Sequence, residues 1–126
     1  FSGKSNAKDA RLINNADANI RFQDHANAGS SFIINAGDFI FSSNSSAGQA
    51  TIMTSEGGNT QFLGDADGGT ASVHIDQNAS LDVSRLNAHR LSLGSLTSAG
   101  DVNLGHTVLS VTDKIVLNES SKLNLI

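Results

Sequence analysis

One residue position recurs along the whole chain at nearly constant spacing, and it constrains the fold more than any other feature of the sequence. Most steps between its occurrences are 21 residues long, and one is 19. The position is held by Phe1, Phe22, Phe41, Phe62, Val83, Leu104 and Leu125. Self-similarity at such a period is typical of solenoids, in which each repeat packs only against its neighbours. The sequence therefore predicts a stack of coils.

The residues just before this position form the pattern of a short strand that leaves a tight corner. The strand begins with a small polar residue that follows glycine or alanine, as in Gly37-Asp38 and Gly100-Asp101. The next residue is the first one that faces inward. Glycine and small polar residues are typical of turns, and alternating apolar positions are typical of strands with one buried face. The inward residues two places before the recurring position are Ile20, Phe39, Thr60, Leu81, Val102 and Leu123.

A second strand is predicted later in each coil. Six places after the recurring position comes a small residue, held by Ala7, Ala28, Ala47 and Gly68. Three residues later comes another small position, which we expect to line an inner corner. It is held by Ala10, Ser31, Ala50 and Ala71. The next inward position is aliphatic, held by Leu12, Ile33, Ile52 and Val73. In the second half of the chain, we interpret Leu91 and Leu93 as residues of this aliphatic position that stand one place early. Ile115 then returns to the original spacing.

No segment shows helical periodicity, and the corners are too short to contain crossover helices. Each strand must then pair in parallel with its equivalent in the next coil. The expected fold is all-β: a right-handed parallel β-helix of about six coils of ~21 residues. We find no linker or change in composition, so residues 1–126 are predicted to form a single β-helix segment.

Composition excludes several classes of function. The net charge is −4 and the eight lysines and arginines are scattered, whereas nucleic-acid binding needs a clustered basic surface, so no nucleic-acid partner is expected. The chain has no cysteine, which excludes disulfides, cysteine-ligated clusters and a thiol nucleophile. It also lacks an apolar run of about 18 residues, the minimum for a membrane-spanning helix.

Several runs resemble the repeats of bacterial autotransporter passenger domains. The resemblance covers nearly the whole chain and rests on the order and spacing of degenerate motifs. These motifs are Phe22-x5-Ala28-Gly29-x3-Ile33-Ile34-Asn35, Phe41-x5-Ala47-Gly48-Gln49-Ala50-Thr51-Ile52, Leu81-Asp82-Val83-Ser84, and Leu91-x-Leu93-Gly94-Ser95-Leu96-x3-Gly100-Asp101-Val102-Asn103-Leu104-Gly105.

The resemblance implies a right-handed β-helix displayed at the outer-membrane surface of a Gram-negative cell, or secreted. It also implies a parent chain with a β-barrel translocator, of which this chain would be a fragment. We expect the first and last coils to need a cover, either flanking sequence or another chain, because unpaired strand edges invite pairing.

Two acidic motifs are candidate sites. Gly64-Asp65-Ala66-Asp67-Gly68-Gly69 is similar to the start of a calcium loop, but it lacks the later acidic ligands, and solvated corner residues explain it better. Asp76, Asp82 and Asp101 could form a catalytic carboxylate cluster as in sugar-cleaving β-helices. Asp82, however, lies between two inward residues and should face water.

The other candidates point to structure. The histidines, His25, His74, His89 and His106, show no metal-ligand spacing. Asn14 and Asn35 occupy the same position one coil apart, and stacked asparagines can hydrogen-bond from coil to coil. The sequence thus predicts no catalytic, cofactor-binding or metal-binding residue, and no cofactor.

The leading functional hypothesis is a non-catalytic adhesin or stalk segment, a virulence factor in cell adhesion. Its partners would be host surface or extracellular-matrix molecules, or copies on sister cells, bound through many weak polar contacts because no aromatic hot spot is evident. The alternative is part of a secreted β-helix enzyme, a protease or polysaccharide-cleaving enzyme, with catalytic residues on its polar face or elsewhere in the parent chain.

Overall fold

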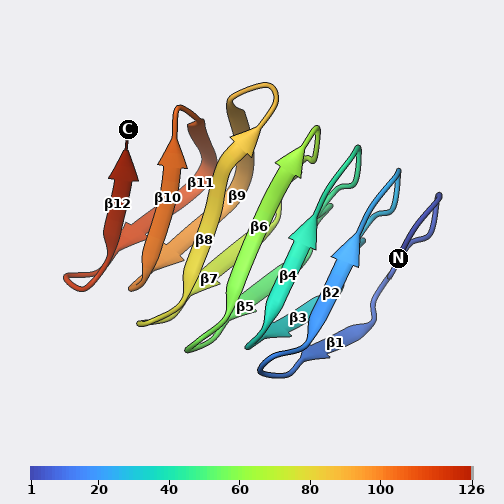
Figure 1. Cartoon of the computed structure of the whole chain (residues 1–126), viewed down its shortest axis with the longest axis horizontal. Helices are drawn as coiled ribbons and strands as arrows, with labels where there is room; N and C mark the ends of the chain where they lie inside the picture. Colours follow the sequence, from blue (N-terminus) through green and yellow to red (C-terminus); the bar gives the residue numbers. More distant parts are fainter. Residues whose placement is uncertain (126) are drawn as a thin grey trace.

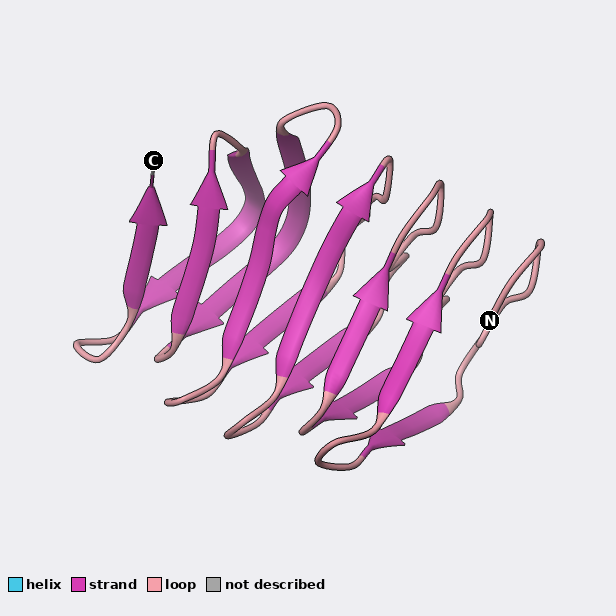
Figure 2. Cartoon of the chain, in the orientation of Figure 1, coloured by secondary structure: helices cyan, strands magenta, loops and turns pink. Residues whose placement is uncertain are grey.

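The computed structural model describes residues 1–125; Ile126 and the side chain of Leu125 lie outside the described part. The described chain contains strands, turns and bends (Figures 1 and 2). Its strands are β1 (Arg11–Asn14), β2 (Asn19–Phe22), β3 (Phe32–Asn35), β4 (Asp38–Phe41), β5 (Thr51–Thr54), β6 (Asn59–Gly64), β7 (Ser72–Ile75), β8 (Ser80–Leu86), β9 (Arg90–Ser98), β10 (Asp101–Gly105), β11 (Val108–Leu117) and β12 (Lys122–Leu125).

The strands stack into two parallel sheets, which confirms the predicted β-solenoid. The odd sheet has the order β1-β3-β5-β7-β9-β11, and the even sheet the order β12-β10-β8-β6-β4-β2, with six strands in each. The chain alternates between the two sheets and advances by one layer per coil, as the succession of colours in Figure 1 shows. No helix of membrane-spanning length and hydropathy occurs in the described part of the chain.

The recurring phenylalanine position forms the centre of the core. Phe22 and Phe41 have ring centroids 5.2 Å apart, and Phe41 and Phe62 are 4.8 Å apart. These separations are close to the spacing of neighbouring strands in a sheet, about 4.8 Å, so each ring stacks on its equivalent one layer on. All three rings are fully buried, as is Val83, which continues the column.

The first coil encloses its phenylalanine of this column less completely than the later coils do. Phe1 stacks on Phe22 at 4.3 Å but remains 45% exposed. Ala10 is likewise exposed, whereas its equivalents Ser31 and Ala50 are buried. The cause is the same for both residues: a solenoid buries each coil between two neighbours, and the first described coil has a neighbour on one side only.

The small residues of the inner corner explain why the coil turns where it does. Ala50 is fully buried between Ser31 and Ala71, and its backbone NH donates to the carbonyl of Ala47 across the corner. The residues on either side of Ala50 form backbone hydrogen bonds with the neighbouring coil. The corner therefore has no room for a longer side chain.

We expect Ala50→Leu to lower the free energy of unfolding by about 1–3 kcal/mol through overpacking. Chemical denaturation measured by circular dichroism would show the loss as a shift in midpoint. Thr51→Leu is the matched control, because Thr51 is the next residue and its side chain is only half-buried on the outer face. Equal stability of the two variants would contradict the placement of Ala50 in the corner.

The predicted assignment of Leu91 and Leu93 to the aliphatic position is wrong. Val73 pairs with Leu96, so Leu96 occupies that position, and Ser72 pairs with Ser95. Gly94 takes the small corner position, with its NH donating to the carbonyl of Ala71. The shift arises because β8 contains a bulge after Asp82 and β9 is extended at its start. Leu91 and Leu93 instead add a second buried pair of positions to β9.

A third, shorter ladder closes each of the first four coils. Isolated parallel bridges join Asn6 to Asn27, Asn27 to Ser46, and Ser46 to Asp67. In each coil the side-chain oxygen of this residue accepts a hydrogen bond from the backbone NH two residues later, at 2.7–3.0 Å. Side chains of this kind stabilise turns by such bonds, so the corner is built from the same local chemistry four times.

Candidate functional site

The outer face of the even sheet is polar along its length except at Ile40, which is buried. Register places its outward residues in two columns that run along the solenoid axis. The first column consists of Asn19, Asp38, Asn59, Ser80, Asp101 and Lys122, and the second of Arg21, Ile40, Gln61, Asp82, Asn103 and Asn124. Within the first column the Ser80 hydroxyl donates to Asn59 Oδ1 at 2.8 Å. We name this surface the polar face.

The outer face of the odd sheet carries an apolar patch over its first three strands. Ile13 is 58% exposed and Phe32 is 39% exposed, and Ile34 and Met53 are half-buried beside them. Register puts Ile13, Ile34 and Met53 in one column. The guanidinium of Arg11 lies 5.6 Å from the centroid of the Phe32 ring, within cation–π distance. We name these four residues, Ile13, Phe32, Ile34 and Met53, the Phe32 patch.

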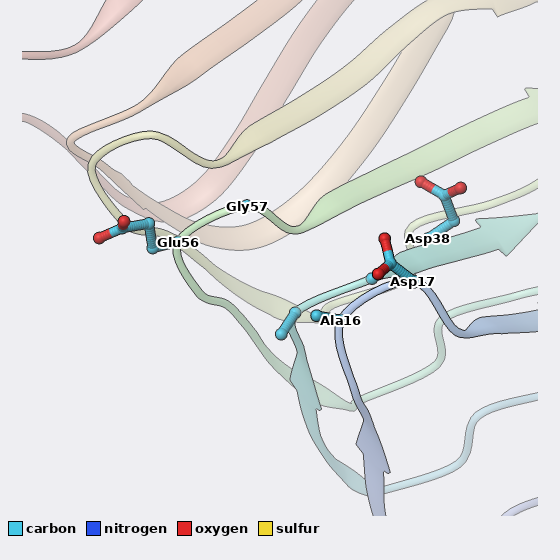
Figure 3. A pocket seen from close by; sticks show the side chains of 7 residues that line it. Ala16, Asp17, Asp38, Glu56 and Gly57 are labelled. Atoms are coloured by element: carbon cyan, nitrogen blue, oxygen red, sulfur yellow. The ribbon is translucent and has the colours of Figure 1, made fainter.

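A notch opens at the corner between the two sheets, with a volume of about 260 Å³ (Figure 3). It is lined by Ala16, Asp17, Ala36, Gly37, Asp38, Glu56 and Gly57. Corner length explains it: two residues join β3 to β4, whereas four join β1 to β2 and four join β5 to β6. The short corner is therefore recessed between two longer ones. In Figure 3 the side chain of Glu56 extends away from Asp17 and Asp38.

Glycine is required at the recessed corner. A Cβ atom on Gly37 would collide with the backbone oxygens of Ala18 and Asn15 in the preceding coil. The same Ala-Gly-Asp corner returns at Ala99-Gly100-Asp101, where two residues again join the strands and a Cβ on Gly100 would collide with backbone of the coil before it. The two-residue corner with an obligatory glycine is thus a built feature of the backbone that occurs twice along the rod.

Carboxylates line this edge of the solenoid at one per coil. They are Asp17, Asp38, Glu56, Asp76, Asp101 and Glu119, each in a corner or at the first residue of the following strand. Among these corners and first strand residues, Lys122 at the start of β12 is the one lysine or arginine. The edge is therefore a line of negative charge that attracts cations. Its carboxylates are spread along the axis, and no group of three or more metal-ligating side chains is found among residues 1–125.

The calcium-like motif forms one of the repeated corners. Asp67 is the member of the short third ladder in its coil, and its Oδ1 accepts from the NH of Gly69 at 2.8 Å. Asn6 and Asn27 make the same bond in earlier coils. Asp65 is exposed and its Oδ1 accepts from Asn87 Nδ2 at 3.2 Å. Both aspartates thus occupy corner positions, as their sequence equivalents predict.

The three aspartates of the candidate carboxylate cluster lie on different elements. Asp76 is in the corner after β7, Asp82 is within β8, and Asp101 begins β10. Asp82 lies between the fully buried Leu81 and Val83 and faces outward, as predicted, and is half-buried. Its Oδ1 accepts two hydrogen bonds from Ser84, from the NH at 2.9 Å and the hydroxyl at 2.6 Å. Asp82 thereby stabilises the bulge of β8.

The histidines are dispersed. His74 points outward from the middle of β7, and His25, His89 and His106 lie in turns outside the strands. All four are exposed. No pair of them shares a column in the strand registers, so the structure brings none of them together.

Asn14 and Asn35 form the predicted hydrogen bond between coils. Asn14 Nδ2 donates to Asn35 Oδ1 at 2.9 Å, and both residues are buried. Asn35 Nδ2 in turn donates to Thr60 Oγ1 at 3.2 Å, and Thr60 shares a 2.7 Å hydrogen bond with Thr54. Asn35 Oδ1 also accepts from the NH of Gly37 at 3.0 Å. This buried network ties the recessed corner to the core, which is a structural role.

The Phe32 patch was missed by the reasoning from sequence, which expected no aromatic hot spot. The signal was present: Ile33 was assigned to the inward column, so its neighbour Phe32 had to point outward. An exposed aromatic ring beside an arginine is a common feature of binding surfaces.

No family model, curated protein or solved structure matches this chain.

Proposed function

We propose that this segment is a non-catalytic adhesin or stalk of a surface-exposed passenger domain, and that the Phe32 patch is its principal contact. One observation carries the proposal: four apolar residues, one of them an exposed aromatic ring, lie side by side on the outer face of the odd sheet. Contiguous exposed apolar surface is uncommon on soluble proteins and marks sites of interaction. Aromatic residues and arginine are the residue types that contribute most at protein interfaces.

The rod supports the patch in a way that suits attachment. Successive layers rise by about 4.8 Å, so side chains in one column are held at a regular spacing on a rigid surface. The polar face provides a second, wettable side with an amide, hydroxyl or carboxylate group in every layer. A macromolecule lying along the rod would contact several layers at once, and many weak contacts then add to one firm attachment.

The proposed partners are host surface or extracellular-matrix macromolecules, or copies of the protein on sister cells. The proposed location is the outer surface of a Gram-negative bacterium, with a β-barrel translocator in the parent chain. These proposals rest on the resemblance to autotransporter passenger repeats together with the solenoid fold. The virulence role follows from the same proposal.

Single substitutions on the polar face and in the corners are expected to change binding only a few-fold. Each such contact is exposed or half-buried at the surface and contributes less than about 1 kcal/mol, which is roughly a five-fold change in affinity. The variants are Asp65→Ala, Asp76→Ala, Asp82→Ala and Asp101→Ala, together with His74→Ala on the outer face of the odd sheet. Binding of cells that display each variant to immobilised matrix, together with their sedimentation rate, would measure the effect.

Circular dichroism spectra of the same variants would show that the fold is intact. If one of these variants abolished activity while remaining folded, the adhesin proposal would be overturned. The alternative of a catalytic carboxylate on the polar face would then be favoured.

Phe32→Ser is expected to weaken binding by roughly ten-fold or more, since truncating an aromatic anchor typically costs 2 kcal/mol or more. Val108→Ser is the matched control, because Val108 is also an exposed apolar residue of the odd sheet but belongs to the other end of the rod. The same display assay measures both variants. Equal loss in the two, or no loss in either, would remove the Phe32 patch from the proposal.

A further inference from the structure

Met53 is the single methionine of this chain, and it lies on the outer face of the odd sheet. Its neighbours within β5, Ile52 and Thr54, are fully buried, so the side chain between them points outward, where it is half-buried. β5 pairs with β3 on one side and with β7 on the other. The surroundings of Met53 are therefore set by complete layers on both sides.

Met53 is also the side chain of this chain that reacts most readily with oxidants. The sequence has no cysteine, tryptophan or tyrosine. A peroxide oxidises an accessible thioether to the sulfoxide, which turns a flexible apolar side chain into a polar one. An oxidant that reaches the folded chain should therefore act first at Met53.

The neighbours of Met53 on the outer face are residues of the Phe32 patch. Register places Ile34 beside Met53 in the layer before it, and His74 beside it in the layer after it. Phe32 pairs with Thr51, so it lies diagonally across from Met53 on the same face. A sulfoxide oxygen at Met53 would thus enter the apolar patch without reaching the core.

We propose that Met53 is an oxidation site at which a peroxide makes the Phe32 patch polar and so releases the macromolecule that the patch binds. The release rests on the proposed adhesion, whereas the modification and the change in surface polarity do not. In the reaction, the sulfur lone pair attacks one oxygen of hydrogen peroxide, so that an S–O bond forms and the O–O bond breaks. The other oxygen leaves as hydroxide and becomes water by taking the proton of the first. The sulfur loses two electrons, and the peroxide gains them.

Treatment of the folded chain with hydrogen peroxide tests the modification. Mass spectrometry should find one added oxygen per chain, located at Met53, at a rate within about ten-fold of that for free N-acetylmethionine. The circular dichroism spectrum should not change, because the side chain points away from the core. Slower oxidation than this in the folded chain, with rapid oxidation once the chain is unfolded in denaturant, would overturn the proposal.

Hydrophobic-interaction chromatography tests the change in surface polarity. The oxidised chain should elute earlier than the untreated chain, and reduction by methionine sulfoxide reductases should restore the original elution. Met53→Leu is the matched control, because leucine has a similar volume and no sulfur; its elution should be the same before and after peroxide. Unchanged elution of the oxidised parent chain would contradict the proposal.

The display assay tests the release. Oxidation should weaken binding of the parent chain to matrix by roughly five-fold, as expected for a polar group introduced into an apolar contact, and should leave Met53→Leu unaffected. If Phe32→Ser lost binding while the oxidised parent kept it, the release would be overturned. If Phe32→Ser bound as well as the untreated parent, the adhesion through the patch would fail and the release with it, and the mass and elution measurements would still decide the modification.

Discussion

Phe41→Ala should lower the free energy of unfolding by roughly 3–5 kcal/mol, the range for removing a fully buried aromatic side chain. The ring of Phe41 lies between those of Phe22 and Phe62 and also contacts Phe39 at 5.3 Å. Removing it opens a cavity in the middle of the column, and the coils on either side are held by their own backbone ladders and cannot close it. Chemical denaturation followed by circular dichroism measures the loss.

Phe32→Ala is the matched control for this variant. It removes the same number of atoms from the same layer of the solenoid, but the ring is 39% exposed on the outer face. We expect its effect on stability to stay near or below about 1 kcal/mol, as for most surface positions. Similar losses in the two variants would show that the column of rings is not the centre of stability.

Asn35→Ala should be the other severe substitution, with an expected loss of about 3–4 kcal/mol from several unsatisfied buried groups. The Asn35 side chain is fully buried and bonds Asn14, Gly37, Asn59 and Thr60. Truncation leaves the NH of Gly37 and the Asn59 carbonyl without these side-chain partners. The loss would be measured by thermal and chemical denaturation of the variant beside the parent chain.

Ser45→Ala is a suitable control for the Asn35 variant. Ser45 is also fully buried, but its hydroxyl has no hydrogen-bond partner. The equivalent position one layer earlier is Ala26, so a methyl group fits this column. We expect the alanine variant to match or exceed the parent in stability, because it removes an unpaired buried hydroxyl. A neutral Asn35→Ala would mean that the hydrogen-bond network does not stabilise the coil.

The architecture followed from the sequence because one position repeats with little variation. A ring or aliphatic residue every 21 residues is enough to set how far the chain travels per coil, and period-two alternation around it sets which side faces inward. The placement of Phe22, Phe41 and Phe62 was therefore predictable to the residue. So was the hydrogen bond between Asn14 and Asn35, since two polar residues in the same inward position must find partners.

The details that failed have a common physical origin. The sequence shows that extra residues enter between Val83 and Leu96, but it does not show whether a bulge or a longer strand absorbs them. The structure places one extra residue in a bulge after Asp82 and a second between Leu86 and Ser95, and together they move Leu96 into the aliphatic position. A period measured along the chain cannot distinguish these outcomes, because both return the chain to the same column.

The candidate surfaces were less predictable than the fold. The notch at Gly37 depends on the lengths of the two corners on either side of it, so it is a property of three coils together. The exposure of Phe32 depends on how far Arg11 and Thr51 in the adjacent layers cover the ring. Neither is a property of one repeat, and periodicity describes only one repeat at a time.

The parallel registers described above have a consequence for how this chain folds. Each strand pairs with segments about 20 residues before and after it, and no pairing joins the beginning of the chain to its end. Loops of that length close quickly, because the entropy of closure grows only slowly with length. One formed coil then acts as the template for the next, so the chain can fold progressively as a zipper while the remainder is still unfolded.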